Sequence, residues 1–443
     1  MTNRLQNLQQ VSGVKKKHRL AWVLLFLGEA AVAVPIAAAG DPAPPSPGIV
    51  GWNEFVDGLR SLPDRMLARL PETMRNDPQV QQEVGRLILE SLAFSTISAI
   101  SADGDHPAFL PASGQVLNIG QPNADTVYRI ARITPGGTYR FRGERGSLRI
   151  ASIGQTGPTP GESGSTATQV GPTKGYEDIN ALHIDKHGRF DVLLSPTRPA
   201  DYKGDWWQLL PSANKLLLRM VSSDWSHEES PTISIERVDG PARKPRVPAA
   251  NLEQRLRQLP GATGFMAMLF VDHVETLRQQ GYVNKLKILD VSQMGGLEGQ
   301  FYYEGAYDLR DDEALIVEAK VPAKCIYRSL ILTNEIYETT DWYNNYSSLN
   351  DSQAKPDKDG VLRIVVSAND PGVPNWVDTA GYPRGVVQGR WTHCDSSPVP
   401  SVRKVAFTDV RTALPSDTPI VTPTQREALI RERNSALQQR PIW

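Results

Sequence analysis

This chain of 443 residues has few cysteines and histidines, and its positive and negative charges nearly balance. It has only two cysteines, Cys325 and Cys394, so a fold held by several disulfides is excluded. The two could form one bridge between strands of the second half, or remain buried thiols, because sequence spacing does not fix the distance between their Cα atoms. The formal net charge is −1, which gives no basic field for a phosphate backbone. We therefore expect no nucleic-acid partner.

The common signatures of cofactor and catalytic sites are also missing. There is no Gly-x-Gly-x-x-Gly after an expected strand, no phosphate-binding loop and no Gly-x-Ser-x-Gly elbow. His183 and His187 lie four residues apart, but the pattern around them predicts strand, turn and strand. A helix would be needed to place both imidazoles on one face, so we expect no metal site and no cofactor.

The first 40 residues have the pattern of an export signal. A basic run at residues 15–19 precedes an apolar segment at residues 20–40, which ends in small residues and predicts a signal peptide cleaved near Ala39 or Gly40. Glu29 inside the apolar segment and the nineteen residues before that segment count against a signal peptide, so an uncleaved anchor in the inner membrane is the alternative. A mildly apolar disordered tail is the remaining alternative. We expect a periplasmic or extracellular protein, or one associated with the membrane through residues 20–40.

The spacing of apolar residues predicts a mainly β protein with accessory helices. Residues 52–100 and 249–281 carry apolar side chains at three- and four-residue intervals, which is typical of helices. After each of these stretches the interval drops to two, and turn residues separate short segments. This alternation favours two tandem antiparallel β-sandwich or jelly-roll domains.

Composition divides the chain into six parts. They are a signal peptide or anchor (1–40), a proline-rich spacer (41–50), helices with a first sandwich (51–240), a linker (241–250), a helix with a second sandwich (251–415) and a C-terminal helix (416–443). Thr424 and Glu427 have the spacing of a capping box at the start of the last helix. This helix has few apolar positions, so we expect it to pack outside the second domain.

The densest group of aromatic, amide and acidic side chains lies at residues 342–391, and it is the candidate ligand site. Prolines stiffen residues 370–381, and a rigid loop with directed polar groups suits a cleft for a small molecule. The alternative is a buried loop whose polar groups bond to its own chain. The residues expected to bind the ligand are Trp342, Tyr343, Asn345, Asn350, Asn375, Trp376, Thr379 and Arg129.

Three charged residues are candidates for chemistry. Asp378 and Asp125 could act as acid or base, and Arg390 could stabilise developing negative charge. Asp125 precedes an expected strand, where closing a turn is the alternative role. The first functional hypothesis is a protein that binds a small, partly apolar molecule or a glycan. A cofactor-free enzyme of the hydrolase or lyase type and a structural protein of the envelope are the alternatives.

Parts of the sequence resemble two bacterial families. Residues 345–353 and 370–381, followed by Arg390 and Trp391, resemble the signature of domain-of-unknown-function family 1214. Residues 123–128, 224–228 and 235–237 are similar to the companion family 1254. The resemblance implies tandem β-sandwich or jelly-roll domains and supplies no established activity. A histidine is expected after the Ala-Gly pair of the signature, where this chain has Tyr382 and Pro383. If that histidine transfers protons in relatives, this chain has lost or altered the group.

Overall fold

The computed structural model describes residues 48–158, 174–289, 297 and 299–441. The expected export segment at residues 1–40 and most of the proline-rich spacer lie outside the described residues. Residues Ile49–Trp443 form one compact unit, separate from Met1–Gly48. The sandwiches, the helices and the candidate site all belong to this unit.

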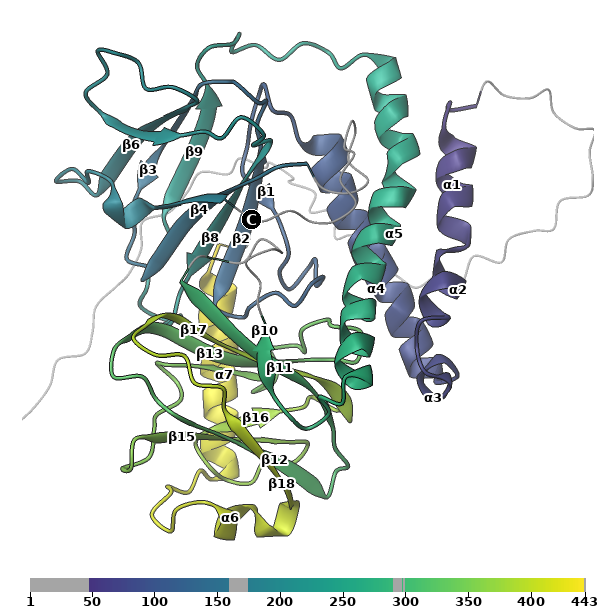
Figure 1. Ribbon diagram of the computed structural model, residues 1–443, viewed down its shortest axis with the longest axis vertical. Helices are drawn as coiled ribbons and strands as arrows, with labels where there is room; N and C mark the ends of the chain where they lie inside the picture. Colours follow the sequence, from purple (N-terminus) through teal and green to yellow (C-terminus); the bar gives the residue numbers. More distant parts are fainter. Residues whose placement is uncertain (1–47, 159–173, 290–296, 298, 442–443) are drawn as a thin grey trace, which may run out of the picture. The chain divides into compact units, whose positions relative to one another are not determined.

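The helices share one core although they come from distant parts of the sequence. They are α1 (Trp52–Arg60), α2 (Leu62–Leu67), α3 (Glu72–Arg75), α4 (Pro78–Thr96), the π-helix η1 (Ile97–Ser101) and α5 (Ala249–Gln279). Met66 and Leu87 from the early helices and Val271 from α5 are buried together. The long helix α5 therefore packs on helices that precede the first sandwich (Figure 1).

One helical stretch among the described residues, Pro78–Ser101, is long and apolar enough to cross a membrane by length and composition. Its residues Val80, Val84, Leu87 and Ile88 lie in the helical core. Packing of this kind gives a soluble helix the same composition, so the stretch is weak evidence for a membrane span.

The first sandwich consists of two sheets. One has the strand order β1 (Leu110–Pro111), β2 (Thr126–Arg132), β8 (Lys215–Val221), β4 (Ile150–Thr156), β5 (Lys174–Asp178), and the other β7 (Asp205–Gln208), β6 (Arg189–Ser195), β3 (Tyr139–Glu144), β9 (Thr232–Arg237). The short 3₁₀ helix η2 (Ile179–Ala181) follows β5. Phe141 and Phe190 meet Leu216 and Leu218 in the core between the sheets.

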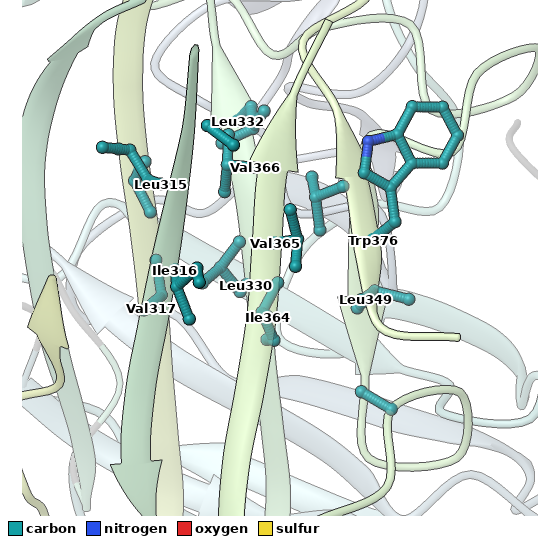
Figure 2. Close-up of a cluster of buried hydrophobic side chains, with 14 of the residues drawn as sticks. Leu315, Ile316, Val317, Leu330, Leu332, Leu349, Ile364, Val365, Val366 and Trp376 are labelled. Atoms are coloured by element: carbon teal, nitrogen blue, oxygen red, sulfur yellow. The ribbon is translucent and has the colours of Figure 1, made fainter. Parts of the chain in front are cut away.

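The second sandwich repeats this plan. One sheet has the order β10 (Lys287–Leu289), β11 (Gln300–Asp308), β17 (Arg384–Cys394), β13 (Cys325–Thr333), β14 (Ser348–Asn350), and the other β16 (Trp376–Asp378), β15 (Val361–Ser367), β12 (Glu313–Lys320), β18 (Ser401–Ala406). Figure 2 shows Leu330 and Leu332 of the first sheet packed against Ile316 and Val365 of the second. The expected fold, mainly β with two tandem sandwiches and accessory helices, is confirmed.

Cys325 and Cys394 lie opposite each other on β13 and β17 and form a disulfide. Of the two alternatives that the sequence left open, the structure has the bridge.

The C-terminal segment contains η3 (Phe407–Asp409), α6 (Val410–Ala413) and α7 (Pro423–Gln439). Helix α7 begins two residues earlier than the expected capping box. Thr422 accepts a hydrogen bond from the backbone of Gln425, whose side chain bonds back to Thr422. Pro423 explains the difference, because proline is favoured at the first helical position.

Candidate functional site

The expected cleft around Trp376 is not found among the described residues. Trp376 belongs to β16, a strand at the edge of its sheet, and its ring lies in the core of the second sandwich (Figure 2). The indole Nε1 donates a hydrogen bond to Ser367 Oγ at 3.0 Å. Asn375 donates to the carbonyl oxygens of Lys355 and Arg363 at 2.8 and 3.1 Å. These polar groups therefore bond to their own chain.

Asp378 and Thr379 continue the same packed segment. The Asp378 carboxylate accepts a hydrogen bond from the backbone of Ala380 at 2.8 Å, and Thr379 is buried. Burial raises the pKa of Asp378, and the bond from Ala380 opposes that rise. Residues 375–379 are thus corrected from a ligand cleft to part of the sandwich. The physical reason is that a strand alternates its side chains, which turns Trp376 into the core.

The aromatic groups near this segment hold arginines of α7. The Arg426 guanidinium lies 4.5 Å from the centre of the Tyr346 ring and 5.0 Å from that of Trp376. Its Nε donates to the Asp370 carboxylate at 2.9 Å. The loop at residues 370–374 therefore receives a cation supplied by the chain itself.

Arg433 follows one heptad later and is also buried. Its guanidinium lies 4.4 Å from the centre of the Trp225 ring, so it reaches the first sandwich. Its Nε and Nη1 donate to the carbonyl oxygens of Trp342 and Ser348 at 2.8 and 3.0 Å. Burial lowers the pKa of Arg433 to about 10, so the group remains a cation at neutral pH.

Arg440 is the third member of the series and directly follows α7. Its Nη2 and Nη1 donate to the carbonyl oxygens of Asp125 and Ala124 at 2.9 and 3.3 Å. A spacing of seven residues returns a side chain to about the same face of a helix. We call Arg426, Arg433 and Arg440 the arginine row; it runs along α7 from the second sandwich to the first.

Two residues that the sequence assigned to the ligand pack against α7 instead. Trp342 and Tyr343 are buried together with Ala436 of the helix and shape a surface that the C-terminal helix occupies. Asn345, also assigned to the ligand, donates to the carbonyl oxygen of Asp341 at 3.1 Å.

Asp125 lies at the centre of a second group, which joins both sandwiches. Its Oδ1 accepts hydrogen bonds from Trp225 Nε1 at 2.8 Å and from Asn350 Nδ2 at 2.7 Å. Its Oδ2 accepts from the Tyr327 hydroxyl at 2.5 Å. Burial raises the pKa of Asp125, and the bonds from Tyr327 and Asn350 oppose that rise. A carboxyl group with this environment can hold or release a proton.

Arg390 is buried near this group. Its guanidinium lies 5.0 Å from the centre of the Tyr302 ring, and its Nη2 donates to Gln388 Oε1 at 3.0 Å. Among the described residues, its Nε has no hydrogen-bond partner and no carboxylate forms an ion pair with it. Burial works against its charge, but nearby tyrosines and Asp125 favour the charged form, so its pKa is raised.

The facing sheet of the first sandwich brings further tyrosine and arginine side chains. Arg219 lies 5.8 Å from the centre of the Tyr176 ring. Burial raises the pKa of Tyr302, which also responds to the charges of Arg390 and Arg219 and to Tyr128. The groups are therefore close together. We call the whole set the interlayer cluster: Asp125, Tyr128, Tyr176, Arg219, Tyr302, Tyr327, Asn350 and Arg390.

Arg129 does not join the interlayer cluster. Neighbouring side chains of a strand point to opposite faces. Val127 and Ala131 of β2 lie in the core of the first sandwich, so Arg129 points to that side and Tyr128 to the other. Burial lowers the pKa of Arg129.

A small hollow of about 50 Å³ adjoins the cluster, lined by residues 111–117, Ala124, Thr126, Val127, Tyr128, Trp342, Tyr343 and Arg440. This volume is enough for one or two water molecules. Two larger hollows are open to solvent: one of about 760 Å³ along α7, and one of about 710 Å³ beside β3 and β6.

Tyr382, at the position where the resemblance leads us to expect histidine, lies in a third polar group. Burial and the carboxyl group of Glu83 raise its pKa, which a hydrogen bond with Arg86 opposes. Arg86 of α4 pairs with the buried Glu338 at 2.5 Å. Burial raises the pKa of Glu90 to about 7, and the negative charge of Glu338 contributes to this rise.

No group of three or more metal-binding side chains occurs in the described part of the chain.

The structure therefore unites three of the expected site residues, Asp125, Asn350 and Arg390, at a place that the sequence did not indicate. Tyr128, Tyr176, Arg219, Tyr302 and Tyr327 complete the interlayer cluster and were not predicted. Its members Asp125 and Asn350 are 225 residues apart in the sequence, and no local pattern marks the group. The arginine row could have been found, since its regular spacing is visible in the tail.

No family model and no curated protein sequence matches this chain. Among solved structures, it is similar to an uncharacterized protein from Burkholderia cenocepacia, with 28% identity, a TM-score of 0.75, and coverage of 81% of this chain and 98% of that one. The VPA0106 protein from Vibrio parahaemolyticus matches with 13% identity and a TM-score of 0.41, over 72% of this chain and 97% of that one. The first likeness supports the fold, the second carries no argument, and neither name states a function.

Proposed function

We propose that the protein is an exported binding protein for a small, partly apolar molecule that carries an acidic group. The ligand is bound at the interlayer cluster, and its acidic group pairs with Arg390. The cluster must open to admit the ligand, because the hollow beside it has a volume of only about 50 Å³. The observation that carries the proposal is the buried guanidinium of Arg390, which forms no ion pair among the described residues.

An isolated buried charge is costly. Taking a cation out of water costs several kcal/mol, and this cost is offset only by a well-placed partner. Guanidinium binds carboxylate through two parallel hydrogen bonds, which makes an organic acid the matching ligand. The rings of Tyr302 and Tyr128 supply apolar surface for the rest of the molecule, and their hydroxyl groups supply hydrogen bonds. A glycan fits this site only if it carries a carboxylate.

Two features support export. The first is the expected signal peptide or anchor at residues 1–40. The second is the disulfide between Cys325 and Cys394, since disulfides persist in oxidising compartments such as the periplasm.

The experiment is calorimetric titration of the full chain with matched acidic and neutral probes. Benzoate and cyclohexanecarboxylate represent the acids, and benzamide and cyclohexanecarboxamide their neutral counterparts. We expect the acids to bind at least tenfold more tightly, a difference of about 1.4 kcal/mol. The variant Arg390→Met should lose this preference, and Arg390→Lys should keep part of it because it retains the charge.

The matched control is Arg403→Met, since Arg403 is exposed on β18. It should bind the acids as the parent chain does. Equal affinity for acids and amides, or an unchanged preference in Arg390→Met, would refute the proposal. Failure of every probe to bind would favour the structural role in the envelope.

A cofactor-free enzyme is the second candidate, because Asp125 is a buried carboxyl group with a raised pKa beside the Tyr327 hydroxyl. Such a group can act as general acid or base. The variant Asp125→Asn keeps the shape of the side chain and removes its ionisable carboxyl group. If the parent chain consumes a bound acid over hours and Asp125→Asn binds it without consuming it, the enzyme is the better description.

A further inference from the structure

Exposed apolar side chains gather at the beginning of the compact unit. Ile49, Val50 and Trp52 are 70%, 60% and 48% exposed, and Leu252 near the start of α5 is 44% exposed. Gly51 lies against Glu253, the neighbour of Leu252. The first turns of α1 and α5 thus lie side by side (Figure 1). We call these four apolar residues the entry patch.

The charges around the entry patch favour an anionic partner. Arg257 pairs with both Glu54 and Glu253, so these three side chains next to the patch carry one net negative charge. The loop that leads into α5 carries Arg243 and Arg246, both exposed, and they bring the sum of these charges to +1. Basic side chains at the rim of an apolar patch that contains tryptophan are typical of surfaces that bind the membrane interface.

The place of the patch in the chain points to the same partner. It directly follows the spacer that connects it to the expected apolar segment at residues 20–40. Eight residues in a polyproline II conformation would span about 25 Å. If the apolar segment remains as an anchor, the patch stays within this reach of the bilayer; if it is cleaved, the patch is the first folded part of the mature chain.

We propose that the entry patch docks on the surface of an anionic phospholipid bilayer. Trp52, Val50, Ile49 and Leu252 enter the interface, and Arg243 and Arg246 contact the headgroups. This docking is separate from ligand binding at the interlayer cluster, and neither depends on the other.

The test is co-sedimentation of residues 41–443 with vesicles. This chain lacks the expected signal peptide and contains the whole of the compact unit. The vesicles consist of phosphatidylcholine alone or of an equal mixture with phosphatidylglycerol. We expect binding to the mixture and at least tenfold weaker binding to phosphatidylcholine, since a basic residue near an anionic surface contributes roughly a fivefold change in affinity.

Two double variants separate the apolar and basic contributions. Val50→Ser with Trp52→Ser should weaken binding to the mixed vesicles by at least tenfold, because it removes most of the apolar surface that enters the interface. Arg243→Gln with Arg246→Gln should remove the preference for phosphatidylglycerol. The matched control is Ile420→Ser, which changes an apolar side chain that is 72% exposed outside the patch; it should alter binding less than twofold.

Equal binding to both kinds of vesicle would overturn the proposal, as would an equal loss in Ile420→Ser. A second copy of the chain is the competing occupant. If sedimentation without lipid shows a dimer that Val50→Ser with Trp52→Ser abolishes, the patch is a protein interface and the proposal fails. Unchanged circular dichroism of the variants ensures that each result concerns the surface.

Discussion

Replacement of Arg433 by methionine tests whether the arginine row holds α7 in place. Methionine keeps the length of the side chain but leaves the carbonyl oxygens of Trp342 and Ser348 without their donor, and also the hydroxyl of Ser348. An unsatisfied buried polar group costs about 1–3 kcal/mol. Three such groups give ~3 kcal/mol at the low end. Removing a cation whose burial is itself costly offsets part of this, so we expect a loss of about 2–4 kcal/mol.

The assay combines urea unfolding with hydrogen exchange. Arg433→Met should lower the unfolding midpoint, and the amides of α7 should lose protection before those of the strands. The matched control is Arg431→Met on the same helix, whose exposed pair with Glu427 is worth about 0.3–0.5 kcal/mol. If both variants lower stability equally, or if α7 keeps its protection in Arg433→Met, the arginine row does not hold the helix.

Three further predictions follow from individual groups. Glu90 has a pKa of about 7 in the folded chain and about 4.3 in the unfolded chain, so the folded chain binds the proton more tightly and stability falls as pH rises from about 4.3 to 7. Glu90→Gln should remove this fall and add about 1–2 kcal/mol at pH 8 after solvent screening. Urea unfolding across this pH range measures both effects. The bridge between Cys325 and Cys394 closes a separation of 69 residues, so dithiothreitol should cost the parent chain roughly 3–4 kcal/mol and the double serine variant nothing; equal sensitivity would contradict the prediction. Asp378→Asn should leave the affinity for benzoate unchanged within about twofold, since the Asp378 carboxylate lies outside the interlayer cluster and bonds to its own backbone. Loss of benzoate binding would return the site to residues 370–381.

The fold could be predicted because its signals are local. Apolar residues at intervals of two, broken by turn residues, identify strands wherever the rest of the chain lies. The same information does not show which strands become neighbours. Asp125 and Asn350 meet at 2.7 Å, although each sits in a segment whose local pattern is only that of a turn or a strand. Long-range pairing of this kind is determined by the packing of whole sheets.

The candidate cleft illustrates a second limit. Rings, amides and carboxylates close together in sequence are what a cation needs, and residues 342–381 do bind two. The cations are Arg426 and Arg433, from the same chain. Composition alone cannot distinguish a site for a free ligand from a surface against which a distant segment of the same chain packs, because both require the same desolvated, hydrogen-bonding surface.

The difference between Arg433 and Arg390 resolves that ambiguity. Each is a buried guanidinium near an aromatic ring, but the bonds of Arg433 run to backbone oxygens of two segments that it joins. Arg390 bonds to Gln388 on its own strand and leaves Nε unbonded within the described residues. Arg426 Nη1 and Arg440 Nε also lack a partner within the described residues, but each of these guanidinium groups donates at least two hydrogen bonds to distant segments. The hydrogen bond of Arg390 stays on its own strand, so its donors join no distant segments and remain for a ligand. On this physical ground the ligand belongs at Arg390.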